Sequence, residues 1–241
     1  MRGLILFVVL CLAACGPTTT GMTPDRQSVD MARAALRGGS PQTALQILSE
    51  SASKGPAPST AALVVQGDAL TQLGRYDEAE LAYTSALRRD DKSPGALIGM
   101  GRLRLSSDPA AAETYFLNSV KADPRNTTGW NDLGVARDLL GHHEGAQEAY
   151  RQALGINPDL SAAVVNMALS LAMTGKADEG VRMLRPLASA SSSSPKVRHD
   201  LAAALAMAGR TDEASQILKA DLSPEDVRKA LDAYVAAKAP R

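Results

Sequence analysis

The sequence predicts an all-α fold, a solenoid in which pairs of antiparallel helices stack in series. First, the phrase GRYDEAELAYTSAL, which begins at Gly74, returns in altered form from Gly141, Gly175 and Gly209. The last three glycines stand 34 residues apart, and a fixed period in this range marks a repeated supersecondary unit. Second, hydrophobic residues make up 45% of the chain but aromatic residues only 3%, so Ala-rich helices must supply the core. Third, no stretch alternates apolar and polar residues at a period of two, so we expect no strands.

Residues 1–14 have the pattern of a lipoprotein signal peptide. Arg2 supplies positive charge, and an apolar run of 11 residues follows from Leu4 to Ala14, which is too short to cross a bilayer comfortably. The sequence LAAC at residues 12–15 resembles the bacterial lipobox. The resemblance implies cleavage between Ala14 and Cys15 and a lipid on the Cys15 thiol, where each buried methylene contributes roughly 0.8 kcal/mol to anchoring.

Residues 15–24 are expected to form a lipidated, flexible tether, since Gly, Pro and Thr dominate them. Gly16, directly after the cysteine, resembles lipoproteins that are sent to the outer membrane. We therefore expect a lipid-anchored protein at the outer membrane that faces the periplasm. Cys11 would leave with the signal peptide, so no second cysteine remains for an internal disulfide.

Charge argues against nucleic acid as a partner. The 26 basic and 26 acidic residues balance, and no basic stripe with interleaved aromatic residues appears. The membrane is expected to be contacted through the lipid anchor, because a near-neutral surface has no long-range attraction to anionic lipid.

The clearest repeat covers residues 127–160. Its apolar, small and aromatic positions are Trp130, Leu133, Gly134, Ala146, Tyr150, Ala153 and Pro158. This set resembles the tetratricopeptide repeat (TPR), and the resemblance implies a right-handed superhelix of helix hairpins. Gly134 is expected to let the two helices approach closely, Tyr150 to fill space between neighbouring repeats, and Pro158 to end the second helix.

The same frame extends over residues 25–238 and gives about six repeats plus a cap. The repeats are expected at residues 25–58, 60–93, 94–126, 127–160, 161–194 and 195–228. The first is the poorest copy, and in the fifth Gly180 and Pro186 are expected to weaken the second helix. Ser-Pro-Glu-Asp at residues 223–226 is typical of a helix start. A capping helix is therefore expected over about 224–238, where it would cover the apolar edge of the last repeat.

The residues that could suggest catalysis have a structural interpretation. In each repeated phrase the Gly ends a first helix, and the following Asp-Glu pair begins the second, where acidic groups favour the positive end of the helix dipole. The pairs at residues 77–78, 178–179 and 212–213 are thus not interpreted as catalytic carboxylates. His142 and His143 are interpreted as solvated turn residues without metal-ligand spacing around them. We expect no enzyme, no catalytic residue, no metal site and no cofactor apart from the lipid on Cys15.

Binding is expected on the concave inner face, which the first helices of such hairpins line and which commonly receives a peptide. By resemblance to other TPRs, the groove would present Asn131, Val135, Asp138, Val165, Leu169, Met173 and His199. Few of these are charged. The expected ligand is therefore a hydrophobic or helical protein segment and not a small-molecule substrate.

The C-terminal block from Met183 to Val227 narrows the family. It combines RPLA, a loose serine-rich spacer, PKVR, the helix DLAAALA, GR and a closing DLSPE. This resembles the TadD family, the TPR lipoproteins of the tight-adherence (Tad/Flp) pilus assembly system. The resemblance implies a pilotin-like factor that helps the pilus secretin, or another Tad component, to localise or assemble. The alternative is a TPR lipoprotein scaffold for another envelope machine, in outer-membrane protein assembly or peptidoglycan synthesis.

Overall fold

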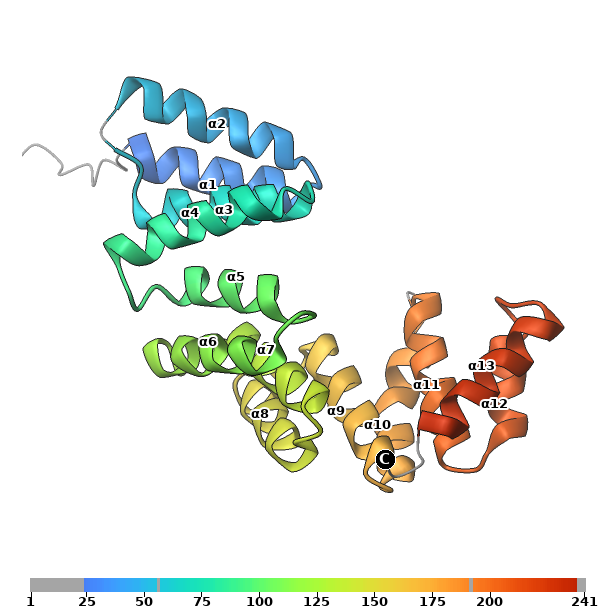
Figure 1. Ribbon diagram of the computed structural model, residues 1–241. Coiled ribbons are helices and arrows are strands. Elements are labelled where there is room, and N and C mark those ends of the chain that lie inside the picture. The colour runs from blue at the N-terminus through green and yellow to red at the C-terminus, as the bar shows by residue number, and fades with distance from the viewer. Residues whose placement is uncertain (1–23, 56, 191–192, 238–241) are drawn as a thin grey trace, which may run out of the picture.

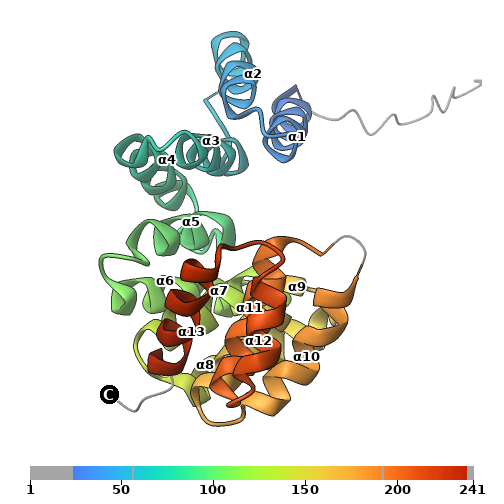
Figure 2. The same cartoon turned by 90° about the vertical axis from the view of Figure 1, so that its right-hand side faces the viewer.

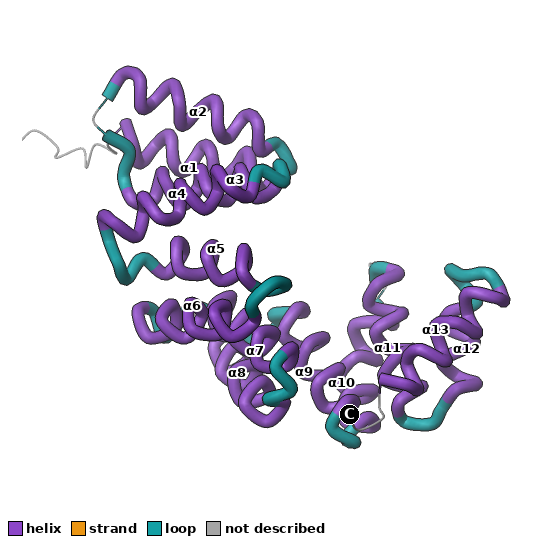
Figure 3. Tube along the Cα trace, in the orientation of Figure 1, coloured by secondary structure: helices purple, strands orange, loops and turns teal. Residues whose placement is uncertain are grey.

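The computed structural model describes residues 24–55, 57–190 and 193–237 (Figure 1). Within these ranges it contains thirteen helices and no strand, which confirms the all-α prediction (Figure 3). None of the described helices combines the length and apolar character needed to cross a membrane. The expected signal peptide, Cys15 and the tether up to residue 23 lie outside the described residues, as does Lys238.

The helices form six hairpins and one final helix. In chain order they are α1 (Pro24–Arg37), α2 (Pro41–Lys54), α3 (Thr60–Gln72), α4 (Tyr76–Arg89), α5 (Pro94–Arg104), α6 (Pro109–Ala122), α7 (Thr127–Leu139), α8 (His143–Ile156), α9 (Ser161–Met173), α10 (Ala177–Ser189), α11 (Pro195–Met207), α12 (Thr211–Leu218) and α13 (Pro224–Ala237). The hairpins follow one another along an arc from the blue to the red end of the chain (Figure 1). At the red end, α13 lies against α11 and α12 (Figure 2).

The pattern of contacts between helices defines an inner and an outer side of the solenoid. Each helix contacts the next in the chain, and each odd-numbered helix also contacts the next odd-numbered one, from α1 through to α13. Successive even-numbered helices make no comparable contacts in the described part of the chain. The odd-numbered helices therefore line the inner side of the solenoid, and α2, α4, α6, α8, α10 and α12 form its outer side.

The turns inside five of the hairpins depend on glycine. Gly39, Gly74, Gly141, Gly175 and Gly209 each follow the first helix of a pair, with φ between 72° and 84°. This left-handed region is open to glycine and costly for residues with a Cβ. The repeated phrase thus marks the turn between two helices. In the third hairpin, Asp108 caps α6 instead, because its Oδ1 accepts a hydrogen bond from the Ala111 amide at 3.0 Å.

Aromatic rings on second helices occupy the space that glycines leave on first helices. The Tyr150 side chain is almost fully buried, and a Cβ on Gly134 would lie only 2.4 Å from its Cε1 atom. The Tyr83 ring is held in the same way between Gly67 and Gly99. Gly134 therefore makes room for the Tyr150 ring of the second helix.

Gly180 is the position where backbones approach closely. A Cβ there would lie 2.3 Å from the carbonyl oxygen of Ala168 in α9. α10 runs unbroken from Ala177 to Ser189 with both Gly180 and Pro186 inside it. Glycine is needed at residue 180 because any side chain would push α10 away from α9.

Candidate functional site

The seven positions expected to line a groove belong to three consecutive inner helices. Asn131, Val135 and Asp138 lie on α7, Val165, Leu169 and Met173 lie on α9, and His199 lies on α11. The structure thus brings them to one side of the solenoid. Their own contacts differ, and these contacts determine how much of each side chain is presented to a ligand.

The carboxylate of Asp138 is engaged in hydrogen bonds with other side chains of the solenoid. Its Oδ2 accepts a hydrogen bond from the Tyr150 hydroxyl at 2.9 Å, and its Oδ1 accepts one from the Ser170 hydroxyl at 2.8 Å. Nδ1 of His143 lies 2.8 Å from the same Oδ1. Burial and the nearby Asp138 charge raise the pKa of Tyr150 far above its usual range, so the phenol remains a donor. This network joins α7, α8 and α9.

Asn131 is also bound internally. Its Oδ1 accepts a hydrogen bond from Asn166 Nδ2 at 3.0 Å, and its Nδ2 donates to Asp132 Oδ1 at 3.1 Å. Arg102 Nε in turn donates to Asp132 Oδ2 at 2.7 Å. A polar ladder thus crosses the inner side from α5 through α7 to α9, and it contributes to the stacking of these hairpins.

The apolar positions present unequal surfaces. Val165 is buried and Leu169 packs against the C-terminal core, while Met173 keeps 39% of its surface exposed. His199 is partly buried, with Nε2 3.3 Å from Oδ2 of Asp221. Met173 is therefore the apolar side chain among them that is best placed to meet a ligand.

A charged cavity on the inner side was not anticipated from the sequence. Its volume is about 410 Å³, and its lining is formed by Arg33, Leu36, Arg37, Asp68, Thr71, Gln72, Tyr83 and Arg102. The positions of the charged residues within the repeat could have indicated this cavity. Arg33 and Asp68 precede their turn glycines by six residues, as Val135 and Leu169 do, and Arg102 follows Asp68 by 34 residues. The repeat positions that are apolar on α7 and α9 are thus occupied by charged residues on α1, α3 and α5.

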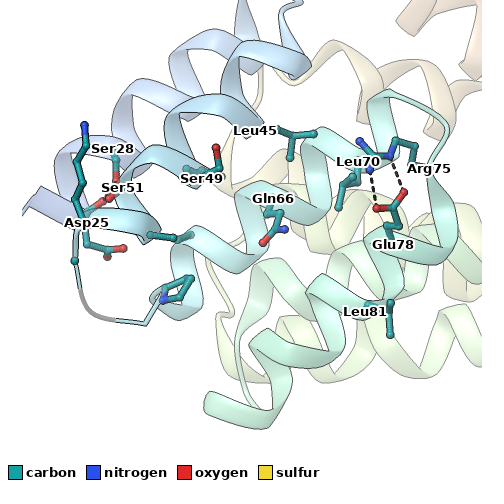
Figure 4. A pocket seen from close by; sticks show the side chains of 16 residues that line it. Asp25, Ser28, Leu45, Ser49, Ser51, Gln66, Leu70, Arg75, Glu78 and Leu81 are labelled. Atoms are coloured by element: carbon teal, nitrogen blue, oxygen red, sulfur yellow. Dashed lines mark hydrogen bonds and ion pairs between the residues drawn. The ribbon is translucent and has the colours of Figure 1, made fainter.

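A larger hollow of about 860 Å³ lies between α2 and α4, with α3 as its floor (Figure 4). Its lining is mainly apolar, and it includes Leu45, Leu48, Ala52, Pro58, Ala62, Leu70 and Leu81. Leu81 is 67% exposed. At one end Arg75 and Glu78 form a two-pronged ion pair, with Nε to Oε1 at 2.7 Å and Nη2 to Oε2 at 2.6 Å. The sequence offered no signal for this hollow, because its walls come from two helices that do not pack on each other.

The acidic pairs of the repeated phrase are located at helix starts. Asp77 and Glu78 lie in the first turn of α4, and Asp212 and Glu213 lie in the first turn of α12. Glu213 is bound by Arg210, with Nε to Oε1 at 2.6 Å, as Glu78 is bound by Arg75. The predicted location of these carboxylates at helix starts is therefore confirmed.

Two family models match this chain, and both describe tetratricopeptide repeats. One covers residues 29–94 and the other covers residues 131–237, so together they account for more than half of the sequence. The chain is a tetratricopeptide-repeat protein. The match over residues 29–94 includes most of the first hairpin, which the sequence presents as the poorest copy of the repeat.

Solved TPR structures share this fold. PilW, a widely conserved type IV pilus biogenesis factor, superimposes with a TM-score of 0.72 at 18% identity, over 88% of this chain and 100% of PilW. PilF of Pseudomonas aeruginosa gives a TM-score of 0.72 at 14% identity, over 87% of this chain and 97% of PilF. At these identities the likeness concerns the fold.

Curated relatives are matched over part of their length. The uncharacterized protein y4yS of Sinorhizobium fredii is 36% identical over 105 residues, 42% of this chain and 58% of that protein. The probable UDP-N-acetylglucosamine–peptide N-acetylglucosaminyltransferase SPINDLY of Hordeum vulgare is 30% identical over 121 residues, 47% of this chain and 13% of SPINDLY. The chain thus spans less than two thirds of either relative.

Proposed function

We propose that this protein is a TPR lipoprotein of the TadD type, a pilotin-like factor that helps the secretin of a Tad/Flp pilus to localise or assemble. Support comes from the superposition on PilW, a type IV pilus biogenesis factor, which covers 88% of this chain and 100% of the solved PilW chain. The lipobox at residues 12–15 and the C-terminal block from Met183 to Val227 point in the same direction. The fold alone leaves other envelope machines open as partners.

Anchor and solenoid have separate roles in this mechanism. Acyl chains on Cys15 hold the protein at the outer membrane, and the residues up to Thr23 connect them to α1. Tethering raises the local concentration of the solenoid near a secretin in the same membrane, while the solenoid surface supplies specificity. No chemical step is assigned, because the acidic pairs that could have suggested one are helix-start residues.

The anchor is tested by Cys15→Ser in the native bacterium. The variant is expected to lose acylation, to keep its signal peptide and to leave the outer-membrane fraction. The amount of assembled secretin multimer should then fall severalfold, as measured by immunoblotting of unheated membranes. Cys11→Ser is the matched control, since it changes the other cysteine of the same segment and should leave processing unchanged.

Three results would contradict the proposal. A Cys15→Ser protein that is still cleaved and found in the outer membrane would exclude the lipobox. Wild-type secretin multimers in a strain that lacks the protein would exclude the pilotin-like role. A defect confined to outer-membrane protein assembly or to peptidoglycan synthesis would assign the protein to another envelope machine.

A further inference from the structure

We propose that the inner-side cavity between α1, α3 and α5 binds an acidic polypeptide segment, whose Asp or Glu side chains pair with Arg33, Arg37 and Arg102. This deepens the proposed function, on which it rests in taking the ligand to be a polypeptide. It also changes the expected chemistry, because the sequence indicated an apolar or helical ligand for the inner face. The N-terminal part of that face has a different character.

The charges of the cavity are unbalanced. Three guanidinium groups line it with a single carboxylate, that of Asp68. Arg37 forms no ion pair with any residue that the structure describes. Arg33 has a long contact of 3.7 Å to Asp30, and both side chains are about half exposed. Exposed pairs of this kind are weak, so the guanidinium groups of Arg33 and Arg37 are available to a ligand.

Arg102 keeps donors free while it is held in place. Its Nε donates to Asp132 at 2.7 Å, which fixes the side chain between α5 and α7. Its side chain remains 51% exposed. A guanidinium group has five N–H donors, so the terminal nitrogens of Arg102 can still bind a carboxylate.

The floor of the cavity is rigid. The Tyr83 hydroxyl donates to Asp68 Oδ1 at 2.8 Å and lies 3.4 Å from the Thr71 hydroxyl. The Tyr83 ring is confined by Gly67 and Gly99, since a Cβ on either glycine would lie 2.5 Å or less from it. Asp68 is thus held in position, where its negative charge opposes an anionic ligand.

The arrangement fits several carboxylates along a segment better than one terminal carboxylate. Arg33 and Arg37 are four residues apart on α1, a rise of about 6 Å. Arg102 is on α5, and α3 lies between these two helices, with packed helices typically about 8–10 Å apart. The cations therefore follow the inner face from the first hairpin to the third. A single carboxylate would satisfy only some of them.

The experiment measures the binding of labelled peptides to the full-length protein, purified in an uncharged detergent, by fluorescence anisotropy. The first probe is a peptide of alternating glutamate and serine with both ends blocked. The second carries glutamine in place of glutamate, and the third is the glutamine peptide with a free C-terminal carboxylate. The glutamate probe should bind tightest, and its affinity should fall as salt is added.

Variants that are expected to change the affinity in opposite directions make the test specific. Arg33→Gln and Arg37→Gln should each weaken binding of the glutamate probe by about two- to fivefold, and fivefold corresponds to about 1 kcal/mol. Asp68→Asn should tighten it by a similar factor, because it removes the opposing charge and keeps an acceptor oxygen for Tyr83. Arg182→Gln is the matched control, an exposed arginine on the outer helix α10 that should leave the affinity unchanged.

The possible outcomes separate clearly. Equal binding of the glutamate and glutamine probes, or an unchanged affinity in Arg33→Gln and Arg37→Gln, would overturn the proposal. Tightest binding of the free C-terminus would assign the site to a chain end instead. Because the assay contains no secretin, a failure here leaves the envelope experiment intact. A failure of that experiment would likewise leave the peptide measurements standing.

Discussion

Replacement of Gly134 by Ala tests the packing on which the hairpins depend. The new Cβ would lie 2.4 Å from Cε1 of Tyr150 and 2.7 Å from two further ring carbons. An ordinary contact begins at about 3.4 Å, so the ring would have to move by about 1 Å. Tyr150 has little freedom to move, because it is 1% exposed and its hydroxyl is bound to Asp138 at 2.9 Å.

The expected change in the stability of Gly134→Ala follows from two opposing effects. Overpacking of a buried site costs about 1–3 kcal/mol, and the hydrogen bond of Tyr150 to a charged group places Gly134→Ala near the upper end. The higher helix propensity of Ala offsets about 1 kcal/mol of this cost. The net loss is therefore about 2 kcal/mol. For a chain of 241 residues this lowers the melting temperature by about 4–8 °C.

Gly155→Ala is the matched control for this prediction. Gly155 lies in α8, the partner helix of the same hairpin, and a Cβ there would meet nothing within 4 Å. The substitution should stabilise the protein by about 0.5–1 kcal/mol and raise its melting temperature slightly. Thermal unfolding followed by far-ultraviolet circular dichroism measures both variants. A Gly134→Ala protein that melts at or above the wild-type temperature would refute the packing argument.

Two further substitutions test the polar groups of the inner side. Tyr150→Phe keeps the ring but leaves Asp138 without one of its donors, so we expect a loss of about 2 kcal/mol and a melting temperature lower by about 4–8 °C; an unchanged melting curve would contradict this. Burial raises the pKa of Asp68, so this carboxyl group binds its proton more tightly in the folded state than in the unfolded state. The stability of the wild-type protein therefore falls as pH rises from about 3.9, the unfolded pKa, through the higher pKa of the folded state. The melting temperature of Asp68→Asn relative to wild type should therefore increase across that window and stay level above it, and parallel pH profiles would exclude the effect.

The sequence predicts most of the architecture because the repeat is a local pattern. Turn glycines such as Gly74 and Gly141 have left-handed backbone, as the repeated phrase indicates. The start of the final helix at Pro224 also follows from local chemistry, a serine, a proline and two acidic residues in succession. These features depend on neighbours within a few positions, so a single sequence contains the information.

The sequence interpretation misses contacts between residues on different helices. Gly180 looked like a weak point in a helix, but its neighbour is the backbone of Ala168 in the preceding helix. His143 was interpreted as solvated, yet it is partly buried beside Asp138. In both cases the partner lies on another helix, and its distance is set by how the hairpin closes. Local patterns do not contain that distance.

The inner face shows how a repeat can keep its fold and change its chemistry. The position six residues before the turn glycine is Arg33 in the first hairpin, Asp68 in the second, Val135 in the fourth and Leu169 in the fifth. Stacking depends mainly on the small and aromatic residues between helices, so this position can vary without loss of the solenoid. A polypeptide that followed the inner face from α1 would meet guanidinium groups over α1 and α5, and then the partly exposed side chains of Val135, Leu169 and Met173. The order of charged and apolar residues in a ligand would therefore fix the direction in which it binds.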